Sequence, residues 1–320
     1  MRFADIRNFS GMGVLMVAIG ASFWGTDGVI RKPLIDDGYS STAIVLAEHL
    51  FLLLFAVPVL FMAREFFGKL NGKQWLALIA IAWGASGLAT VLFTEAFARG
   101  NPTTVILLQK TQPIIAVLLA GLLLRERLPR LYWPCFGVAL VGAYLVSFGT
   151  LDPLWNLSSA QLTAAGLAVG AAALWGAGTV FGRYMLADTA FTTLTAARFF
   201  FAVPFLFGMA IWRDSVSETF DGIGAHPERM FLLALIPGLL SMLFYYWGLQ
   251  RTRASYATLA ELSFPATALI LNWIFLDATI TGTQAFGFAL LWGSIAALTW
   301  LPALRRSSVQ RAAEVTASTS

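Results

Sequence analysis

The stretch Phe55-Ala56-Val57-Pro58 returns unchanged as Phe201-Ala202-Val203-Pro204, 146 residues further along the chain. Three more pairs of segments recur in the same order: Ala21–Gly25 with Ala172–Gly176, Gln109–Pro113 with Glu261–Pro265, and Phe136-Gly137 with Phe286-Gly287. All four distances fall between 146 and 152 residues, which chance matches among apolar residues would not readily produce. The pattern predicts two related repeats.

Long apolar segments surround these motifs. Ten can be marked, with short loops between them: residues 11–30, 42–62, 74–97, 103–124, 131–149, 161–185, 190–212, 230–249, 255–276 and 283–303. Each is close to the roughly 20 residues that a helix needs to cross a bilayer. We predict an all-α integral membrane protein of ten transmembrane helices, divided into a first five-helix repeat (1–150), a second (151–306) and a disordered cytoplasmic tail (307–320).

Five spans per repeat is an odd number, so the second repeat enters the membrane from the opposite face. The two repeats are then inverted copies around a pseudo-twofold axis in the membrane plane. A binding site on such an axis is exposed to either side when the halves exchange conformations. The expected architecture is that of an alternating-access carrier.

The composition agrees with a membrane location. Of the 320 residues, 58% are hydrophobic and 12% are charged, against about 25% charged in a soluble domain. This excludes a nucleic-acid binder, a disordered protein and a disulfide scaffold, since Cys135 is the only cysteine. With the N-terminus inside, 14 of the 21 Lys and Arg residues lie inside, 5 outside and 2 within spans, which favours cytoplasmic termini.

Four charged residues lie within predicted spans: Glu95, Lys110, Arg198 and Glu261. A charge at mid-span costs about 2.5–3.5 kcal/mol on insertion scales, so such groups face a cavity or a partner. The two cations are suited to a carboxylate and the two glutamates to an ammonium, which together predict recognition of a zwitterion. Interhelical ion pairs are the alternative, above all between Glu95 and Arg99.

Two polar stripes occupy matching places in the repeats. Gln109, Gln112 and Pro113 share one face of the fourth span, and Glu261 and Pro265 repeat the spacing on the ninth. A proline inside a helix removes a backbone hydrogen bond and kinks the helix. We expect the stripes to face each other across a central cavity, with ordinary polar contacts between helices as the alternative.

Aromatic and small residues complete the candidate site. Trp24 and Trp175 occupy matching positions of the first and sixth spans, and Tyr245 and Tyr246 lie on the eighth. These rings suit a flat or apolar ligand, although tryptophan also serves as an anchor at the membrane interface. Each Trp is followed by a glycine that allows helices to bend or approach closely: Gly25 and Gly176.

One short motif would fit an enzyme instead of a carrier. Gly84-Ala85-Ser86-Gly87 resembles the serine motif of intramembrane rhomboid proteases, in which a later histidine activates the hydroxyl. The only later histidine is His226, in a predicted outside loop. No phosphate-binding loop and no metal-spaced cluster occurs, so we expect no catalytic residues, no metal and no cofactor.

These motifs together resemble the drug/metabolite transporter superfamily of ten-span, EamA-type carriers. The resemblance rests on Trp24-Gly25 and Trp175-Gly176, on Gln112-Pro113, and on Arg125-Glu126-Arg127-Leu128 at the end of the fourth span. It implies a basket-like fold with a cavity lined by the first, third, fourth, sixth, eighth and ninth spans. Arg198 and His49 would be more peripheral.

Within that superfamily the sequence most resembles the YddG group of exporters of aromatic and other hydrophobic amino acids in the bacterial inner membrane. The resemblance implies export of such amphiphilic amino acids, with a multidrug or other small-metabolite exporter as the alternative. Uniport and proton antiport both stay open, because Glu95, Glu261 and His49 are titratable. Surfaces that face lipid and subunits look alike in sequence, which leaves the oligomeric state open.

Overall fold

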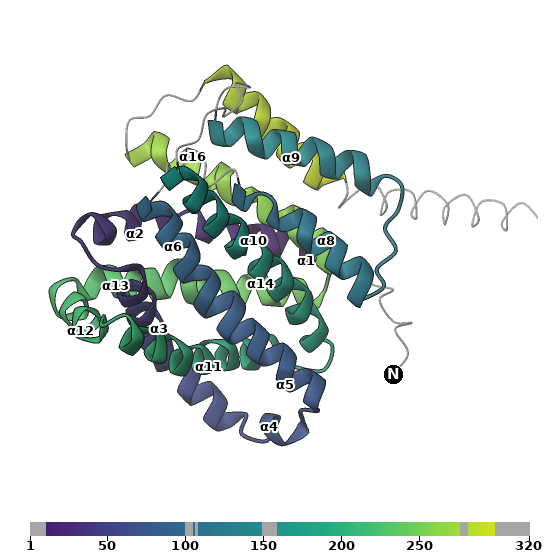
Figure 1. Cartoon of the computed structure of the whole chain (residues 1–320). Coiled ribbons are helices and arrows are strands. Elements are labelled where there is room, and N and C mark those ends of the chain that lie inside the picture. The colour runs from purple at the N-terminus through teal and green to yellow at the C-terminus, as the bar shows by residue number, and fades with distance from the viewer. Residues whose placement is uncertain (1–10, 100–104, 106–107, 149–158, 276–280, 298–320) are drawn as a thin grey trace, which may run out of the picture.

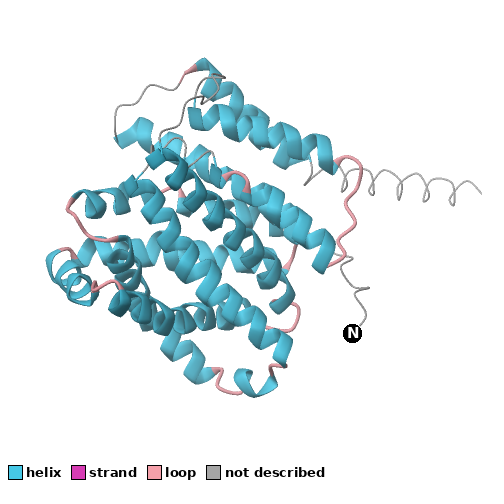
Figure 2. Ribbon diagram, in the orientation of Figure 1, coloured by secondary structure: helices cyan, strands magenta, loops and turns pink. Residues whose placement is uncertain are grey.

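The computed structural model describes residues 11–99, 105, 108–148, 159–275 and 281–297. Within these ranges the secondary structure is helical throughout and no strand occurs (Figure 2). The all-α prediction is confirmed for this part of the chain. The predicted tail, 307–320, lies outside the described residues.

The first half of the chain contains the following helices: α1 (Gly11–Trp24), α2 (Asp27–Asp36), α3 (Ser41–Met62), α4 (Phe66–Lys69), α5 (Gly72–Ile79), the π-helix η2 (Ala80–Leu88), α6 (Ala89–Arg99), α8 (Gln112–Leu123) and α9 (Tyr132–Phe148). The second half contains these: α10 (Ser159–Met185), α11 (Phe191–Trp212), α12 (Val216–Ala225), α13 (Pro227–Leu233), the π-helix η3 (Ala234–Leu240), α14 (Ser241–Gln250), α15 (Ala254–Ala260), the 3₁₀ helix η4 (Glu261–Ser263) and α16 (Phe264–Phe275). A further helix covers 282–297.

Helical residues are found in each of the ten predicted segments. Six helical stretches are long and apolar enough to cross a membrane: Gly11–Asp36, Ser41–Met62, Gly72–Arg99, Leu162–Met185, Phe191–Trp212 and Pro227–Gln250. Two shorter apolar helices cover Gln112–Leu123 and Tyr132–Val146. Several apolar spans are therefore confirmed, whereas the number of ten complete crossings stays a prediction.

The first span is longer than predicted and is interrupted. Its helix turns at Gly25-Thr26, where the Gly25 amide donates to the Ser22 carbonyl (3.0 Å), and then continues to Asp36 rather than ending near residue 30. The sequence suggested an earlier end because Arg31-Lys32 is charged. The helix continues because Arg31 is buried and paired with carboxylates.

The fourth and ninth spans are also interrupted, at matching places. Lys110 and Thr111 form a turn before α8, and the 3₁₀ segment η4 separates α15 from α16. Pro113 and Pro265 each lie in the first turn of the helix that follows the interruption. Proline is favoured there because its missing N–H would have no partner in the first turn of a helix.

The two halves pack on each other reciprocally. The first helix of each half packs along the third span of the other: α1 contacts α14, and α10 contacts η2 and α6, while α3 lies along α11 (Figure 1). Glycine permits these close approaches. A Cβ atom on Gly20 would lie 2.7 Å from the Ser241 carbonyl oxygen, and one on Gly178 would lie 2.5 Å from the Ala85 Cβ.

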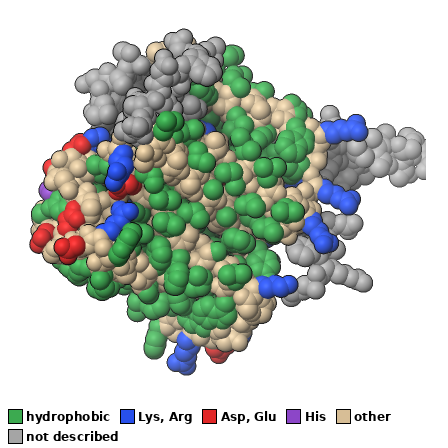
Figure 3. Space-filling view, viewed as in Figure 1, with side chains coloured by type: hydrophobic (Ala, Val, Ile, Leu, Met, Phe, Trp, Pro, Cys, Tyr) green, Lys and Arg blue, Asp and Glu red, His purple; other side chains and the backbone are tan. Residues whose placement is uncertain are grey.

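One face of the molecule is apolar across its middle. Figure 3 shows hydrophobic side chains across the broad central part of one face, with acidic side chains gathered at the end that holds α12 and α13. Large apolar side chains such as Leu54 and Phe61 are about 70% exposed, at 68% and 72%. Exposed apolar surface of this extent marks contact with a membrane or with other proteins.

Candidate functional site

A cavity of about 670 Å³ lies between the two halves. Its walls come from α1, α2, α3, η2 and α6 of the first half, from α10, α11, η3, α14 and α16 of the second, and from Gln109 and Gln112. This volume is within the range of about 300–1,000 Å³ that is typical of sites for small molecules.

Aromatic side chains form much of the wall. Trp24 packs on Tyr245 with ring centroids 5.2 Å apart, and Trp175 packs on Phe93 at 5.1 Å. All four rings line the cavity, as does Tyr246. The two matching tryptophans are thus placed at the cavity, where they offer flat apolar surfaces to a ligand.

Glu261 lies directly behind this wall. Its carboxylate accepts hydrogen bonds from Gln112 Nε2 (2.5 Å), Tyr245 OH (2.6 Å) and Thr179 Oγ1 (3.2 Å), and these three donors line the cavity. The two polar stripes of the fourth and ninth spans therefore meet in a direct hydrogen bond rather than standing on opposite sides of a cavity. Glu261 is fully bonded by protein side chains.

Lys110 is a buried cation at the turn before α8. It is 8% exposed, and its Nζ atom lies 3.6 Å from the centroid of the Phe264 ring, which lines the cavity. Within the described residues it forms no ion pair. A cation over an aromatic face is stabilised by the ring quadrupole, so the Lys110 charge is held next to the cavity without a carboxylate.

Glu95 has the ion-pair arrangement that the sequence left open. One carboxylate oxygen lies 2.6 Å from Arg99 Nε, and the other accepts from Ser41 Oγ (2.9 Å) and lies 3.7 Å from Arg213 Nη1. It does not contribute to the described cavity lining. Glu95 thus joins α6 to α3 and to the end of α11.

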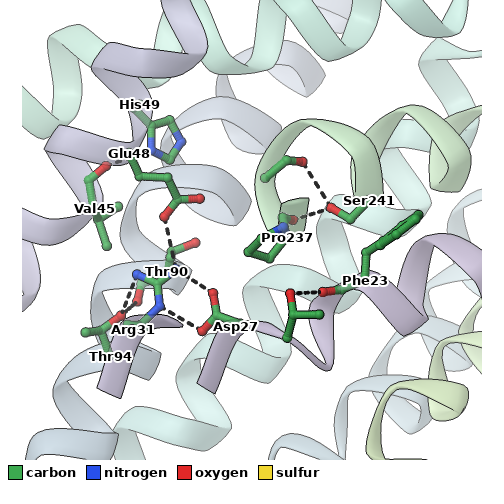
Figure 4. A network of polar contacts seen from close by, with 12 residues as sticks. Phe23, Asp27, Arg31, Val45, Glu48, His49, Thr90, Thr94, Pro237 and Ser241 are labelled. Carbon is green, nitrogen blue, oxygen red and sulfur yellow. Dashed lines mark hydrogen bonds and ion pairs between the residues drawn. The ribbon is translucent and has the colours of Figure 1, made fainter. Parts of the chain in front are cut away.

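A buried ion network lies at the α2 end of the cavity. Arg31 donates to both carboxylate oxygens of Asp27 (2.8 and 2.7 Å) and to Glu48 Oε2 (3.0 Å), as Figure 4 shows. The Arg31 and Glu48 side chains are 6% and 8% exposed. The two carboxylates that line this end therefore share one cation, which holds α2 against α3.

Arg198 lines the cavity, which corrects the expectation that it would be peripheral. Its Nε donates to Ser86 Oγ (2.7 Å), and its Nη1 donates to Tyr246 OH (3.0 Å) and contacts Met242 Sδ (3.2 Å). None of these groups is an anion. The contact also gives Ser86 a role in the wall, because its hydroxyl bonds an arginine rather than a catalytic histidine.

His49 also lines the cavity, so this second expectation of a peripheral residue is likewise corrected. Its Nδ1–H donates to the Val45 carbonyl (2.8 Å), and its ring packs edge-on against Phe199. Its Nε2 is buried without a hydrogen-bond partner among the described residues. The carbonyl bond fixes the proton on Nδ1.

The two glycines after the tryptophans have different surroundings. Gly25 lies in the turn between α1 and α2 and lines the cavity. Gly176 stays inside the continuous helix α10, where a Cβ atom would lie 3.1 Å from the Gln112 carbonyl oxygen. Gly25 therefore allows the bend between α1 and α2, and Gly176 allows α10 and α8 to cross closely.

Some of the site was missing from the sequence interpretation. Thr179 and Phe93 carried no signal beyond their place on apolar spans. Arg31 and Glu48 did: both are charged residues within or next to an apolar run, which implies a partner. Their mutual pairing was not visible because it joins the first span to the second.

A helical protein with apolar spans and a ligand-sized cavity between its halves is a membrane protein built to hold a small molecule inside. The profile of the EamA-like transporter family matches residues 11–148 and 162–317. The chain belongs to this family of transporters and is not an enzyme. The predicted superfamily is thereby confirmed, as is a multi-pass membrane protein with two related domains.

Individual relatives agree with this assignment. The riboflavin transporter ImpX of Fusobacterium nucleatum is 28% identical over 267 residues, covering 82% of this chain and 89% of the relative. The uncharacterised transporter YwfM of Bacillus subtilis is 26% identical over 289 residues, which cover 87% of this chain and 90% of the relative. A crystal structure that is 15% identical superposes with a TM-score of 0.72 over 91% of this chain and 98% of the other, which supports the fold.

Proposed function

We propose that this transporter is a secondary carrier of amphiphilic amino acids, aromatic and other hydrophobic ones, which it exports across the bacterial inner membrane by alternating access. The observation that carries the proposal is the cavity of about 670 Å³ with aromatic walls and a few buried polar groups. Aromatic faces suit the apolar body of such a substrate, and fixed polar groups orient its head.

The packing of the halves supports alternating access. The contacts of α1 with α14 and of α10 with η2 and α6 are the exchange of partners that an inverted pair of five-helix repeats produces. The interruptions before Pro113 and Pro265 correspond in the same way. Broken helices at matching places are common at the binding sites of carriers with this symmetry.

The charge distribution supports cytoplasmic termini. In Figure 3 acidic side chains gather at the end with α12 and α13, with some Lys and Arg side chains beside them, whereas the opposite end shows Lys and Arg side chains without acidic ones. The positive-inside rule assigns the basic end to the cytoplasm. The cavity lining reaches Ile35 near the acidic end, and none of its described residues comes from 124–131 or 251–255 at the basic end.

A second substrate is favoured by one comparison. A relative that covers most of this chain is named a riboflavin transporter. Riboflavin carries a flat three-ring system, and the aromatic walls near Trp24 and Trp175 fit planar molecules as well. Riboflavin is therefore the closest competitor to the amino acids, ahead of lipophilic cations as for a multidrug exporter.

The test is uptake into liposomes that contain the purified protein. Radiolabelled tryptophan, phenylalanine, leucine and riboflavin are supplied with and without an imposed pH gradient, beside Trp175→Ala and Trp133→Ala variants. Trp175 lines the cavity, whereas Trp133 is 54% exposed on α9 and is the matched control. We expect saturable amino-acid uptake that falls about tenfold in Trp175→Ala and stays unchanged in Trp133→Ala.

Other outcomes decide between the alternatives. Uptake of riboflavin without any amino acid would move the assignment to flavin transport. Uptake of quaternary ammonium dyes alone would move it to drug export. Stimulation by the pH gradient would indicate proton antiport, and insensitivity to it would indicate uniport.

A further inference from the structure

The charged side chains that line the cavity do not balance one another. Arg31 is paired with Asp27 and Glu48, and the adjacent Lys32 is paired with Asp36. Arg198 remains, because no described carboxylate forms an ion pair with it. Among the described lining residues it is the one cation without a carboxylate partner.

The bonding of Arg198 is also incomplete. A guanidinium has five N–H donors, yet only Nε and Nη1 have partners among the described residues. The side chain is anchored by Ser86 on η2 and by Tyr246 on α14, and Arg198 as a whole is 8% exposed in the cavity wall. A buried cation whose N–H groups lack acceptors destabilises the fold, unless a ligand supplies those acceptors.

A second basic side chain lies next to the cavity. Lys110 contacts the Phe264 ring without any described carboxylate partner, and that ring lines the same cavity. The carboxylate of Glu261, behind the cavity wall, already accepts from three protein donors. Among the described lining residues, Arg198 is therefore the cation that has no carboxylate partner, whereas Asp27 and Glu48 share Arg31.

We propose that Arg198 anchors the carboxylate of the ligand, and that the site selects aromatic organic carboxylates whether or not they carry an ammonium group. The proposal rests on the proposed function and deepens it. Ser86 and Tyr246 are positioning residues that hold the guanidinium with its free Nη2 toward the ligand. Arginine suits this role because it stays charged and the two N–H groups of Nη2 are left to donate to a carboxylate.

A ligand series tests this directly. Binding is measured by titration calorimetry with the full-length purified protein for tryptophan, for indole-3-propionate, which lacks the ammonium, for tryptamine, which lacks the carboxylate, and for uncharged riboflavin. The variants are Arg198→Gln and Arg198→Lys. Arg183→Gln is the matched control, since Arg183 donates to the Thr252 carbonyl and is absent from the described lining.

We expect the wild type to bind tryptophan and indole-3-propionate with similar affinity and tryptamine at least about tenfold more weakly, because hydrogen bonds to charged groups are worth that much. Arg198→Gln should weaken the two carboxylates about tenfold or more and change tryptamine and riboflavin less than about twofold. Arg198→Lys should restore part of the carboxylate affinity, and Arg183→Gln should match the wild type.

Two results would overturn the proposal: tryptamine binding as well as indole-3-propionate in the wild type, or an equal loss for all ligands in Arg198→Gln. The wild-type series and Arg198→Lys keep the test decisive if Arg198→Gln unfolds. The two proposals fail separately. Amino-acid transport that is indifferent to Arg198 would end this proposal alone, whereas carboxylate binding without amino-acid transport would end the amino-acid assignment and leave the Arg198 site standing.

Discussion

At the scale of single residues, Glu261 holds three helices of the cavity wall together. Its carboxylate accepts from Gln112 on α8, Thr179 on α10 and Tyr245 on α14. A buried acceptor with three donors has its hydrogen-bonding capacity well used, which is what burial of a carboxylate requires. The residue therefore shapes the wall by fixing the side chains that line it.

Removing this acceptor should destabilise the fold. Glu261→Ala leaves Gln112 Nε2 without its acceptor, while Thr179 Oγ1 and Tyr245 OH keep their mutual contact (2.7 Å), and we expect the free energy of unfolding to fall by about 1–3 kcal/mol. Glu261→Gln should lose much less, because its amide oxygen still serves Tyr245 and Thr179 while the Gln112 amide rotates to offer its own oxygen. Melting temperatures of the purified variants in detergent check this, and an unchanged melting temperature for Glu261→Ala would contradict it.

The sequence predicted which residue types belong to the site better than how they are oriented. A charge within an apolar run implies a polar environment, so Lys110, Arg198 and Glu261 stood out. Which way each side chain points depends on the rotation of its helix about its own axis, and that rotation is set by tertiary packing. Arg198 consequently proved to line the cavity, while Glu261 lies behind it.

At the scale of helices, two crossings of the halves depend on glycine. Gly20 brings α1 onto the backbone of α14, and Gly178 brings α10 onto η2. Membrane helices gain van der Waals contact in this way, since apolar side chains alone give little preference for protein over lipid. In each crossing, the first span of one half packs on the third span of the other half. Both crossings therefore belong to the scaffold that forms the cavity.

A single methyl group should therefore disrupt either crossing. Gly20→Ala and Gly178→Ala place a Cβ atom 2.7 Å or less from its neighbours, and we expect each to cost about 1–3 kcal/mol of stability. Gly166→Ala in α10 is the control, because a Cβ there meets nothing within 4 Å and alanine favours a helix. Thermal unfolding in detergent compares the three, and equal melting temperatures would rule out a tight fit.

The placement of helices followed well from the sequence, but their interruptions followed only in part. Apolar runs reveal spans because each span must satisfy its own backbone within lipid. Pro113 and Pro265 marked where the fourth and ninth spans change, since proline cannot continue a helix unaltered. The π-helical segment η2 carried no such mark, and Pro237 within η3 did not reveal the type of helix, because π-helical geometry depends on what packs against the segment.

At the scale of the whole molecule, the two halves are tied at both ends. At the acidic end, Glu218 accepts from the Ser40 amide and hydroxyl, and Asp37 pairs with Arg229 (3.6 Å). At the basic end, Glu126 accepts from the Ala254 amide (2.9 Å) and from the Ser255 amide and hydroxyl, so it caps the start of α15. The second tie lies where the described cavity lining stops.

The Glu126 tie should therefore act as a barrier between the cavity and the cytoplasm. Arg125 adopts a left-handed φ of 54°, which ends α8 and directs the chain toward α15. Glu126→Ala removes the cap and leaves the first amides of α15 without their partner, so the state that opens at this end becomes more populated. We expect a cysteine at position 90, which lines the cavity, to be labelled severalfold faster from the cytoplasmic side.

The measurement uses Thr90→Cys in a Cys135→Ser background, inside-out membrane vesicles and a membrane-impermeant maleimide. Glu65→Ala is the control, because Glu65 belongs to a loop of the same predicted side, is 82% exposed and pairs only with Lys69 among the described residues. Labelling that rises in Glu126→Ala but not in Glu65→Ala would show that the carboxylate holds the cytoplasmic path closed. Equal labelling rates in Glu126→Ala and Glu65→Ala would mean that helix packing forms the barrier. The hydrogen bonds of Glu126 would then be a result of the closed state and not its cause.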